Sequence, residues 1–377
     1  MDAVLTKVEI PVVALQDVVS RASKGSTFID VIPLSTMMEV KIKDNVLSAK
    51  TTNNSYYLTA IYDKQVVQPD FEIVVDTKAF TALVGKLKGE IVSISVEGIK
   101  ITLQTKTGKY NFSYSTDTDG SIVKFPEPTF TPDGSTTHIT PSELRSILSL
   151  NKTCKSVTKD NPALFNYYFD TEKVLTSNDS KAGYNPIKVV DRATALTPDF
   201  FELVPNVIDD NGDKTAYGVD ISENNDSIMF FSNKGILTGK KASQADLESL
   251  TLFAQAYTDI FNDEMSNVVE ISRTDLLDVI DPMILFTNSY EQNRIKITFT
   301  QTGMTFFDIT SESEERVDFV TPLTEDIQPV VLEVNALELK EQLTACSEIV
   351  KLSFDDTKLK LTMPDGSKML LGIVEVG

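Results

Sequence analysis

The chain has 377 residues, 41% of them hydrophobic, so it is long enough for two or three packed domains. It carries 35 Lys and Arg against 55 Asp and Glu, which gives a formal net charge of −20. This balance argues against a protein that binds nucleic acid through an open patch, because such proteins are basic. No apolar run approaches the ~20 residues that span a bilayer. We expect no signal peptide, because the first residues lack a basic, apolar leader.

One pattern recurs six times: a short strand, a helix-start signal, an amphipathic helix and a run of strands. The recurrences begin near Val8, Phe71, Thr137, Thr194, Asn267 and Val330. Repetition at a nearly constant spacing is a strong signal of architecture. We therefore predict six similar units that pair into three domains, spanning residues 1–130, 131–263 and 264–377. Such an array can form an arc.

Each predicted helix opens with residues that favour a helix N-terminus. Thr140-Pro141-Ser142-Glu143 combines an N-cap Thr, a Pro at the first helical position and a Glu that completes a capping box. The other starts are marked by Pro11, Asp76, Thr197-Pro198-Asp199, Ser272 to Asp275 and Asn335 to Glu338. Apolar residues then recur at helical spacing, as at Leu15, Val18 and Ala22. Pro205 and Pro282 predict that the fourth and fifth helices are short or kinked.

After each helix the hydrophobic period changes to two. The segments from Arg294 to Phe299 and from Lys358 to Thr362 alternate apolar and polar residues. Alternation indicates antiparallel strands with one buried face. Turn signals such as Asp44-Asn45 and Asp365-Gly366 separate the strands. The sequence predicts an α+β fold, with mostly antiparallel sheet and one helix across the apolar face of each unit.

The residues that could perform catalysis are few. His138 is the only histidine, and its position in a predicted strand favours a structural role. Cys154 and Cys346 are isolated, so they indicate neither a zinc site nor a disulfide framework, and a reducing compartment is expected. We predict no catalytic residue, no metal and no cofactor, and therefore a protein that is not an enzyme.

Two short motifs favour ordinary turns over ligand sites. The segment from Gly235 to Lys241 has three residues between its glycines, and Lys241 replaces the Ser or Thr of a phosphate loop. A hairpin is the favoured interpretation. The segment from Asp209 to Asp213 is rich in oxygen ligands but lacks the ordered series of a calcium loop. It is interpreted as a solvated turn.

Several stretches, taken in order over almost the whole chain, resemble the bacterial sliding clamp, the β subunit of the replicative DNA polymerase. Residues 109–116, followed by Lys124-Phe125-Pro126, resemble the end of the family's first domain. The opening of the second domain is matched by 139–150, 165–172 and 175–179, and the third domain by 276–286 and 294–299. The stretch from Met369 to Val376 stands where the family has its closing strand.

The resemblance implies a DNA-clamp fold in which three domains form half of a ring. Two chains would close the ring head to tail as a homodimer, with helices lining the hole and sheets forming the rim. The ring would encircle duplex DNA and tether the replicative polymerase without reading sequence. An acidic chain is compatible with this function, because a closed ring stays on DNA without strong affinity. The implied location is the cytoplasm, or the host cytoplasm for a phage-encoded chain.

The resemblance and the helix positions also imply three sets of site residues. The DNA-facing set is Arg21, Lys24, Lys86, Lys88, Arg145, Lys152, Lys155, Lys159 and Arg273. The set for the pocket that receives short hydrophobic peptides from the polymerase and the clamp loader is Phe165, Asn178, Asp179, Ser180, Lys181, Leu371, Ile373 and Val374. The ring-interface set is Phe112, Ile284 and Leu285. For every residue the alternative is an ordinary core or solvated position.

The sequence departs from the family pattern at the peptide pocket and in two helices. The family's Thr-Asp-Gly-His-Arg loop reads Asn178-Asp179-Ser180-Lys181-Ala182, and Ser243 to Ala254 replaces its Phe-Pro-Asp-Tyr-Arg-Arg segment. This divergence favours a bacteriophage clamp matched to its own polymerase. The predicted helices Asp199 to Asp210 and Arg273 to Pro282 are acidic, so we expect an inner wall poor in positive charge and few contacts to DNA.

Two other functions compete with the clamp. A structural or assembly protein of a virus, built from repeated α+β units, would form large open assemblies. A hydrolase using scattered carboxylates is disfavoured because no nucleophile–base arrangement is visible. The clamp predicts a small closed oligomer, since a head-to-tail contact closes only when its rotation divides a full turn.

Overall fold

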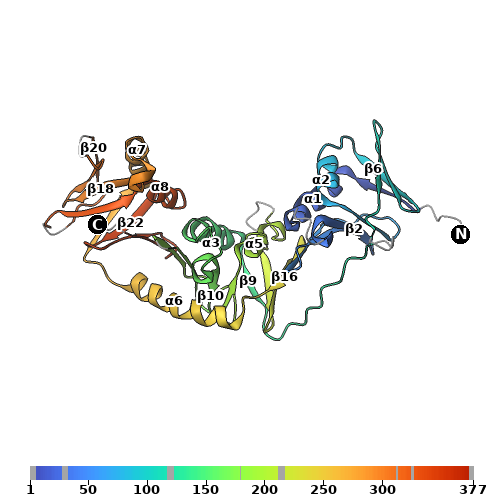
Figure 1. Ribbon diagram of the computed structural model, residues 1–377, viewed down its shortest axis with the longest axis horizontal. Helices are drawn as coiled ribbons and strands as arrows, with labels where there is room; N and C mark the ends of the chain where they lie inside the picture. The colour runs from blue at the N-terminus through green and yellow to red at the C-terminus, as the bar shows by residue number, and fades with distance from the viewer. Residues whose placement is uncertain are drawn as a thin grey trace. The chain divides into compact units, whose positions relative to one another are not determined.

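The computed structural model describes residues 6–27, 33–116, 123–178, 180–210, 217–310, 313–323 and 327–372 (Figure 1). The chain divides into two compact units, each built from two separate segments. Unit 1 comprises Met1–Pro141 and Asp199–Lys241, and unit 2 comprises Ser142–Pro198 and Ala242–Gly377. The three-domain division at residues 130 and 263 stays a prediction.

Unit 1 contains an eight-stranded and a four-stranded antiparallel sheet. In spatial order, the larger sheet consists of β5 (Phe71–Asp76), β2 (Met37–Lys43), β3 (Val46–Thr52), β4 (Tyr56–Ile61), β16 (Gly235–Lys240), β15 (Ser227–Ser232), β14 (Val219–Glu223) and β9 (Thr137–Ile139). The smaller sheet consists of β1 (Thr6–Pro11), β6 (Ile91–Glu97), β7 (Lys100–Gln104) and β8 (Lys109–Ser113). Pairing of β4 with β16 joins segments that are distant in sequence, with Leu58 opposite Leu237.

Helices α1 (Val12–Ala22) and α2 (Thr77–Val84) lie together against the sheets of unit 1 (Figure 1). The predicted apolar stripe of Leu15, Val18 and Ala22 is fully buried there, packed with strand residues such as Val40 and Leu47. The short helical turns of this unit are η1 (Ser23–Gly25), η2 (Pro33–Thr36) and η3 (Val204–Asn206). α5 (Pro198–Phe201) stands where the chain re-enters unit 1.

Unit 2 has the same pair of sheet sizes. Its larger sheet consists of β13 (Thr194–Leu196), β10 (Tyr167–Phe169), β11 (Val174–Ser177), β12 (Lys181–Asn185), β24 (Lys368–Gly372), β23 (Lys358–Thr362), β22 (Ile349–Phe354) and β17 (Asn267–Ser272). Its smaller sheet consists of β20 (Glu314–Asp318), β19 (Gly303–Phe307), β18 (Arg294–Phe299) and β21 (Val330–Asn335). Pairing of β12 with β24 again joins distant segments.

The helices of unit 2 contribute to two hydrophobic clusters. Its helices are α3 (Pro141–Cys154), α4 (Pro162–Phe165), α6 (Gln244–Asn262), α7 (Arg273–Ile284), α8 (Ala336–Thr344) and the turn η4 (Ser289–Glu291). Leu150 of α3, Leu276 of α7 and Leu339 of α8 share one buried cluster with the sheets. α6 packs through Leu250 and Phe261 on a second cluster.

The predicted helix starts are confirmed where side-chain caps are visible. The Asp76 carboxylate accepts a hydrogen bond from the Ala79 amide at 2.7 Å. Ser272 caps α7, and the Asn335 side chain accepts from two amides of α8. These bonds satisfy amides that have no partner within the helix. The fourth predicted helix is short, as expected, with Pro205 in η3, and Pro282 lies near the end of α7.

Helix α6 was not predicted from the sequence. The Ser243 side chain caps its N-terminus by accepting a hydrogen bond from the Asp246 amide. The Ser-x-x-Asp motif could therefore have predicted this helix start from the sequence. Leu250, Ala254 and Phe261 follow at helical spacing and are buried. No described helix has both the length and the apolar character needed to cross a membrane. The α+β class with antiparallel sheets is confirmed.

Candidate nucleic-acid and partner interfaces

Arg21, one of the predicted DNA-facing residues, is tied into unit 1. Its guanidinium pairs with Asp17 one helical turn earlier, at 2.6 Å. It also donates to the backbone carbonyls of Ile61 at 2.8 Å, Lys234 at 2.6 Å and Asn206 at 3.0 Å. These bonds connect α1 to the end of β4 and to the turn that precedes β16. A DNA contact by Arg21 stays a prediction, to be made in addition to this structural role.

Three other predicted DNA-facing lysines of unit 1 are open to solvent. Lys24 lies in η1, and Lys86 and Lys88 follow α2. No described residue forms an ion pair or a hydrogen bond with the side chain of any of the three. Their ammonium groups are available to a polyanion.

The Lys234–Asp63 ion pair fastens the β4–β16 junction, with Nζ 2.6 Å from Oδ2. The hydrogen bond from Lys234 holds the pKa of Asp63 below its ordinary value. We expect Asp63→Asn to lower the free energy of unfolding at pH 7 by about 0.5–1 kcal/mol, because the pair is partly solvated. A depressed carboxyl pKa stabilises the fold above the unfolded pKa and ceases to do so as pH falls through the folded pKa. The deficit should therefore persist down to about pH 3.8, shrink as pH falls further, and vanish only below the lowered pKa of Asp63 in the folded chain.

Urea unfolding at several pH values measures this deficit. The matched control is Glu97→Gln, because Glu97 is an exposed carboxylate of unit 1 without a described ion-pair partner. A deficit for Asp63→Asn that does not depend on pH would mean that the ion pair does not contribute.

The predicted DNA-facing residues of unit 2 differ in environment. Arg145 and Lys152 are exposed on α3. Lys155 and Lys159 place their ammonium groups 5.9 and 5.5 Å from the centre of the Phe165 ring. At these distances each ammonium group is attracted by the negative face of the ring.

Arg273, at the start of α7, is engaged within unit 2. Its guanidinium donates to Glu348 and to the Cys346 carbonyl, each at 3.3 Å. The rest of α7 carries the exposed acids Asp275 and Asp278. The surface of α7 is thus acidic, as expected from the sequence.

Part of the predicted peptide-pocket set lies close together in unit 2. The Asn178 side chain accepts from the amides of Ser180 and Lys181, which closes the turn between β11 and β12. Ser180 donates to Glu338, and Lys181 pairs with Glu341 at 2.5 Å, so both contact α8. Lys181 stands opposite Leu371 in the sheet. Asp179, Ile373 and Val374 lie outside the described residues.

The register of β24 decides which leucine faces which helices. Leu371 is buried in the cluster that contains α7 and α8, whereas Leu370 is buried in the cluster of α6. Adjacent strand residues point to opposite faces. Phe165 is buried beneath its two lysines. The assignment of these residues to a peptide pocket stays a prediction.

α6 closes the sheet face on which it lies. The cavity beneath it measures about 10 Å³, which is about the volume that one water needs. Tyr168, Leu175, Phe253 and Tyr257 are among the residues that line it. At this point no more than about one water fits between α6 and the sheet.

Lysines of β23 and β24 hold the C-terminal end of α6. Lys360 Nζ donates to the carbonyls of Phe261 and Asp263 at 3.2 and 2.7 Å, and Lys368 Nζ donates to Phe261 at 3.2 Å. Burial and the neighbouring Lys368 lower the pKa of Lys360. Cations at a helix C-terminus satisfy its free carbonyls and stabilise the helix.

The ring-interface set combines packed and exposed residues. Phe112 of β8 packs edge-to-face on Phe80, with ring centres 6.0 Å apart. Ile284 is partly buried against the core of unit 2. Leu285 and Phe286 are 81% and 57% exposed, which is unusual for adjacent large apolar residues. Phe286 extends this exposed apolar pair and was not among the predicted interface residues.

The candidate chemistry noted in the sequence has structural explanations. The His138 ring contacts Tyr217, and Nδ1 lies 3.0 Å from Asp220. Burial raises the pKa of Cys154 and of Cys346 to about 12, so neither is a ready thiolate.

The two short motifs are also accounted for as far as they are described. Gly235 opens strand β16 of a hairpin with β15, as predicted. Asp209 is buried and bridges to Gly218, so the solvated-turn interpretation does not hold for this residue, and 211–216 lie outside the described residues. No metal-binding cluster of His, Cys, Asp or Glu occurs in the described part of the chain.

Comparison with known proteins identifies the fold through solved structures and not through sequence. No protein-family model and no curated sequence matches the chain. The structure matches the DNA polymerase III β subunit of Thermotoga maritima at 15% identity, with a TM-score of 0.80, over 99% of this chain and 100% of that one.

Two further solved structures match over a similar length. The sliding clamp of Bacillus subtilis matches at 14% identity, with a TM-score of 0.82, over 99% of this chain and 100% of that one. The sliding clamp of Pseudomonas aeruginosa bound to griselimycin matches at 13% identity, with a TM-score of 0.81, over 98% and 100%. The chain therefore has the sliding-clamp fold of the bacterial DNA polymerase III β subunits.

Proposed function

We propose that this chain is a DNA polymerase processivity factor: a ring-shaped homodimer that encircles duplex DNA and tethers a replicative polymerase. The observation that carries the proposal is the match to β clamps, which extends over at least 98% of this chain and the full length of the clamps. A shared fold does not by itself fix function. Three features of the chain add support.

The first feature is a pair of open sheet edges. Among the described residues, β8 is an outer strand of the small sheet in unit 1, and β20 is an outer strand of the small sheet in unit 2. Most residues of both strands are exposed. An unpaired edge is a template for a strand of another chain. Pairing β8 of one copy with β20 of the next is a head-to-tail contact that closes a ring of two.

The second feature is that the two edges complement each other chemically. β20 carries the acids Glu314, Glu315 and Asp318 against the single base Arg316. β8 begins with Lys109, and the neighbouring strand β7 begins with Lys100. Opposite charges favour the heterologous pairing over β20 with β20. α7, which contacts β20, ends beside the exposed Leu285 and Phe286. These side chains supply apolar area for the same contact.

The third feature is the distribution of charge. At a net charge of −20, the chain is repelled by DNA at long range. The open lysines Lys24, Lys86 and Lys88 can make a few salt-sensitive phosphate contacts. Weak contacts of this kind suit a ring that slides and is retained by topology.

The proposal includes partners that dock through short hydrophobic peptides, namely the polymerase and the clamp loader. It places the chain in the cytoplasm, with a bacteriophage as the source that best explains its divergence. In this account the chain holds other proteins on DNA and performs no reaction itself.

Sedimentation equilibrium tests the assembly that the proposal requires. We expect a single closed species of twice the 41.7 kDa chain mass, with no larger species as concentration rises. Growth into open-ended polymers would instead favour a structural assembly protein, since a head-to-tail contact that fails to close propagates.

A further inference from the structure

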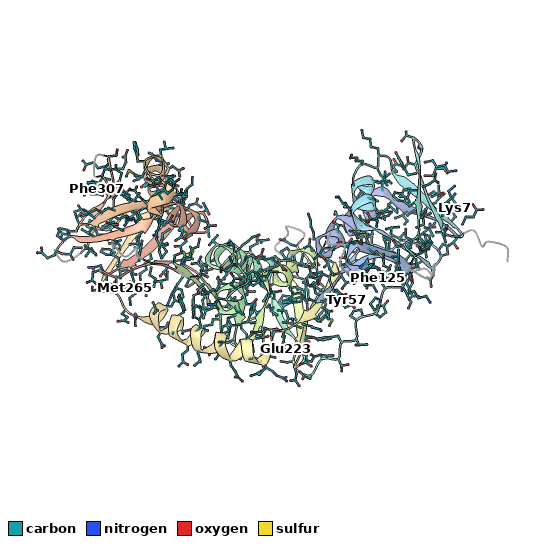
Figure 2. All side chains as sticks on the ribbon, viewed as in Figure 1. Lys7, Tyr57, Phe125, Glu223, Met265 and Phe307 are labelled. Atoms are coloured by element: carbon teal, nitrogen blue, oxygen red, sulfur yellow. The ribbon has the colours of Figure 1, made fainter. Side chains whose placement is uncertain are left out.

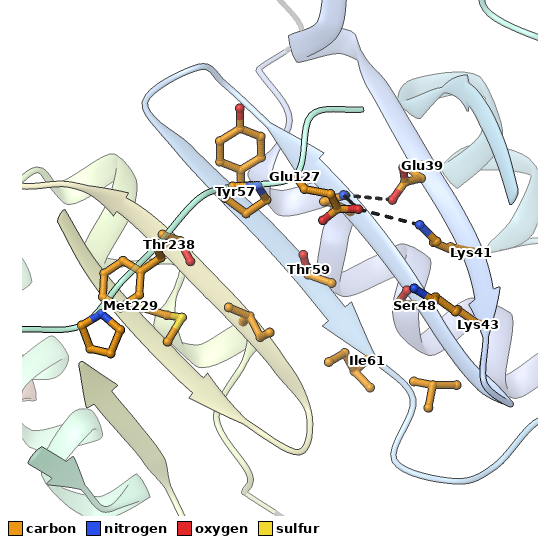
Figure 3. A pocket seen from close by; sticks show the side chains of 16 residues that line it. Glu39, Lys41, Lys43, Ser48, Tyr57, Thr59, Ile61, Glu127, Met229 and Thr238 are labelled. Carbon is orange, nitrogen blue, oxygen red and sulfur yellow. Dashed lines mark ion pairs between the residues drawn. The ribbon is translucent and has the colours of Figure 1, made fainter. Parts of the chain in front are cut away.

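A groove lies on the face of the large sheet in unit 1 that points away from α1 and α2. Its volume is about 600 Å³, within the range of ligand sites in proteins. Strands β2, β3, β4, β15 and β16 form its floor. Residues 123–132, called the strap below, cross the sheet above it (Figure 3). Tyr57 on β4 and Phe125 on the strap locate this face in Figure 2.

The floor of the groove is partly apolar because of the strand register. Thr59 stands opposite Ile236, and Ser48 stands opposite Ile61, so these side chains share one face. Ile61, Ile236 and the nearby Met229 are half-exposed. Residues of the alternate face, such as Leu58 and Leu237, are fully buried. A half-exposed aliphatic floor beneath a strap gains free energy when apolar side chains cover it.

An ion-pair network fastens the strap to the sheet. Glu127 on the strap lies 3.1 Å from Lys50 and 3.7 Å from Lys41. Lys50 also pairs with the buried Glu39 at 3.1 Å and lies 5.9 Å from the Phe125 ring centre. Although burial acts to raise it, the lysines hold the pKa of Glu127 below its ordinary value. The strap is thus held in place and the groove is preformed.

The groove is less acidic than the rest of the chain, although Lys41 also pairs with Glu72 at 3.4 Å. Its lining carries three lysines, Lys41, Lys43 and Lys50, against Glu39 and Glu127, on a protein of net charge −20. Lys43 is exposed at the rim beside Val46, and no described residue pairs with its ammonium group. A carboxylate at this end of the groove would find an unpaired cation.

We propose that this groove docks a short extended acidic peptide from a partner protein, with aliphatic side chains at alternate positions and a carboxylate at Lys43. Alternate side chains of an extended peptide point the same way, which suits the aliphatic floor. Glu39, Glu127 and the apolar floor disfavour a nucleic-acid backbone. The inference rests on the proposed function, because a tethering ring needs such a docking site, and α6 closes the corresponding face in unit 2.

The test is a binding titration of the full-length protein with two labelled probes. The acidic probe is the hexapeptide Asp-Ile-Thr-Ile-Ser-Asp, and the basic probe has Lys at both ends. The wild type should bind the acidic probe saturably and the basic probe about tenfold more weakly. Ile236→Asp should weaken binding of the acidic probe by about tenfold or more, because the substitution places a carboxylate in the apolar floor. Val46→Asp is a second variant that should also weaken binding of the acidic probe. It changes the rim of the groove and leaves the packing of the floor unchanged.

Lys43→Glu should reverse the preference, so that the basic probe binds more tightly than the acidic one. Matched controls are Lys78→Glu and Val67→Asp, which change an exposed lysine and an exposed valine of unit 1 outside the groove. They should bind the acidic probe as the wild type does. Absence of saturable binding by the wild type, or equal effects of groove and control variants, would overturn the inference. So would tighter binding of a single-stranded oligonucleotide that Lys43→Glu abolishes.

A parallel measurement separates this inference from the proposed function. Each variant is assembled around nicked circular DNA, and its retention is compared with that of the wild type. Groove variants should stay on circles normally while losing the peptide. A wild type that binds the peptide through the groove but is not retained on circles would refute the clamp and leave the groove assignment intact.

Discussion

Replacing Leu285 and Phe286 together with Asp is expected to turn a closed dimer into folded monomers. Both side chains are largely exposed in the single chain, so the substitution removes little from the core. In the proposed ring they are covered by the next copy, and two buried unpaired carboxylates would cost several kcal/mol. The dimer dissociation constant should rise by about a thousandfold or more, since each 1.4 kcal/mol is a factor of ten. Retention on circular DNA should be lost.

Analytical ultracentrifugation measures the loss, and circular dichroism checks that the monomers are folded. The control is Leu252→Asp, because Leu252 is a 73% exposed leucine on α6 of the same unit, away from the β20 edge. The control should remain dimeric. A double variant that still sediments as the wild-type dimer would show that the end of α7 is not part of the interface.

Phe261→Ala is expected to have the largest effect on stability. Phe261 is fully buried between α6 and the sheet, with its ring 5.5 Å from that of Tyr184. Its carbonyl also accepts from Lys360 and Lys368, so the residue anchors the end of the helix. Truncating a buried Phe leaves a cavity and typically lowers the free energy of unfolding by about 3–5 kcal/mol.

Hydrogen exchange of the α6 amides, together with urea unfolding, measures this change locally and globally. Leu252→Ala is the matched control on the same helix, and an exposed position should change stability by no more than about 0.5 kcal/mol. Faster exchange confined to α6 and its sheet partners is expected in Phe261→Ala. Equal protection in the two variants would mean that α6 does not rely on this contact.

The local signals in the sequence predicted most of the helix starts. Asp76, Ser272 and Asn335 cap helices because a side-chain oxygen one position before a helix satisfies amides within the next few residues. This chemistry is encoded within four residues and can be read without the fold. The alternation of the strands is equally local.

Other features depend on contacts between distant segments. The eight-stranded sheets arise because β4 pairs with β16 and β12 pairs with β24, and no local period specifies those partners. α6 escaped prediction because it falls where the repeat pattern expected strands, although Ser243 and Asp246 mark its start. The sequence alone does not show which surface the apolar face of α6 covers, because that surface is a sheet formed by distant segments.

The environment of individual site residues also depends on contacts that the local sequence does not specify. Leu370 and Leu371 are equivalent in a hydrophobic pattern, but the register of β24 places them on opposite faces. The position of Arg21 in the helical pattern predicts a side chain that faces solvent. In the structure its guanidinium instead donates to three backbone carbonyls from distant parts of the chain. The groove under the strap was not predicted, because Glu127 meets Lys50 and Lys41 only in the folded chain.

Retention on circular DNA is the most direct test of encirclement. Rings would be assembled in the presence of a nicked circular plasmid, separated from free protein by gel filtration, and then treated with an enzyme that cuts the plasmid once. We expect the protein to comigrate with the circle at a salt concentration that abolishes ordinary phosphate contacts, and to leave once the plasmid is linear. Equal amounts on circular and linear DNA, or none on either, would contradict encirclement.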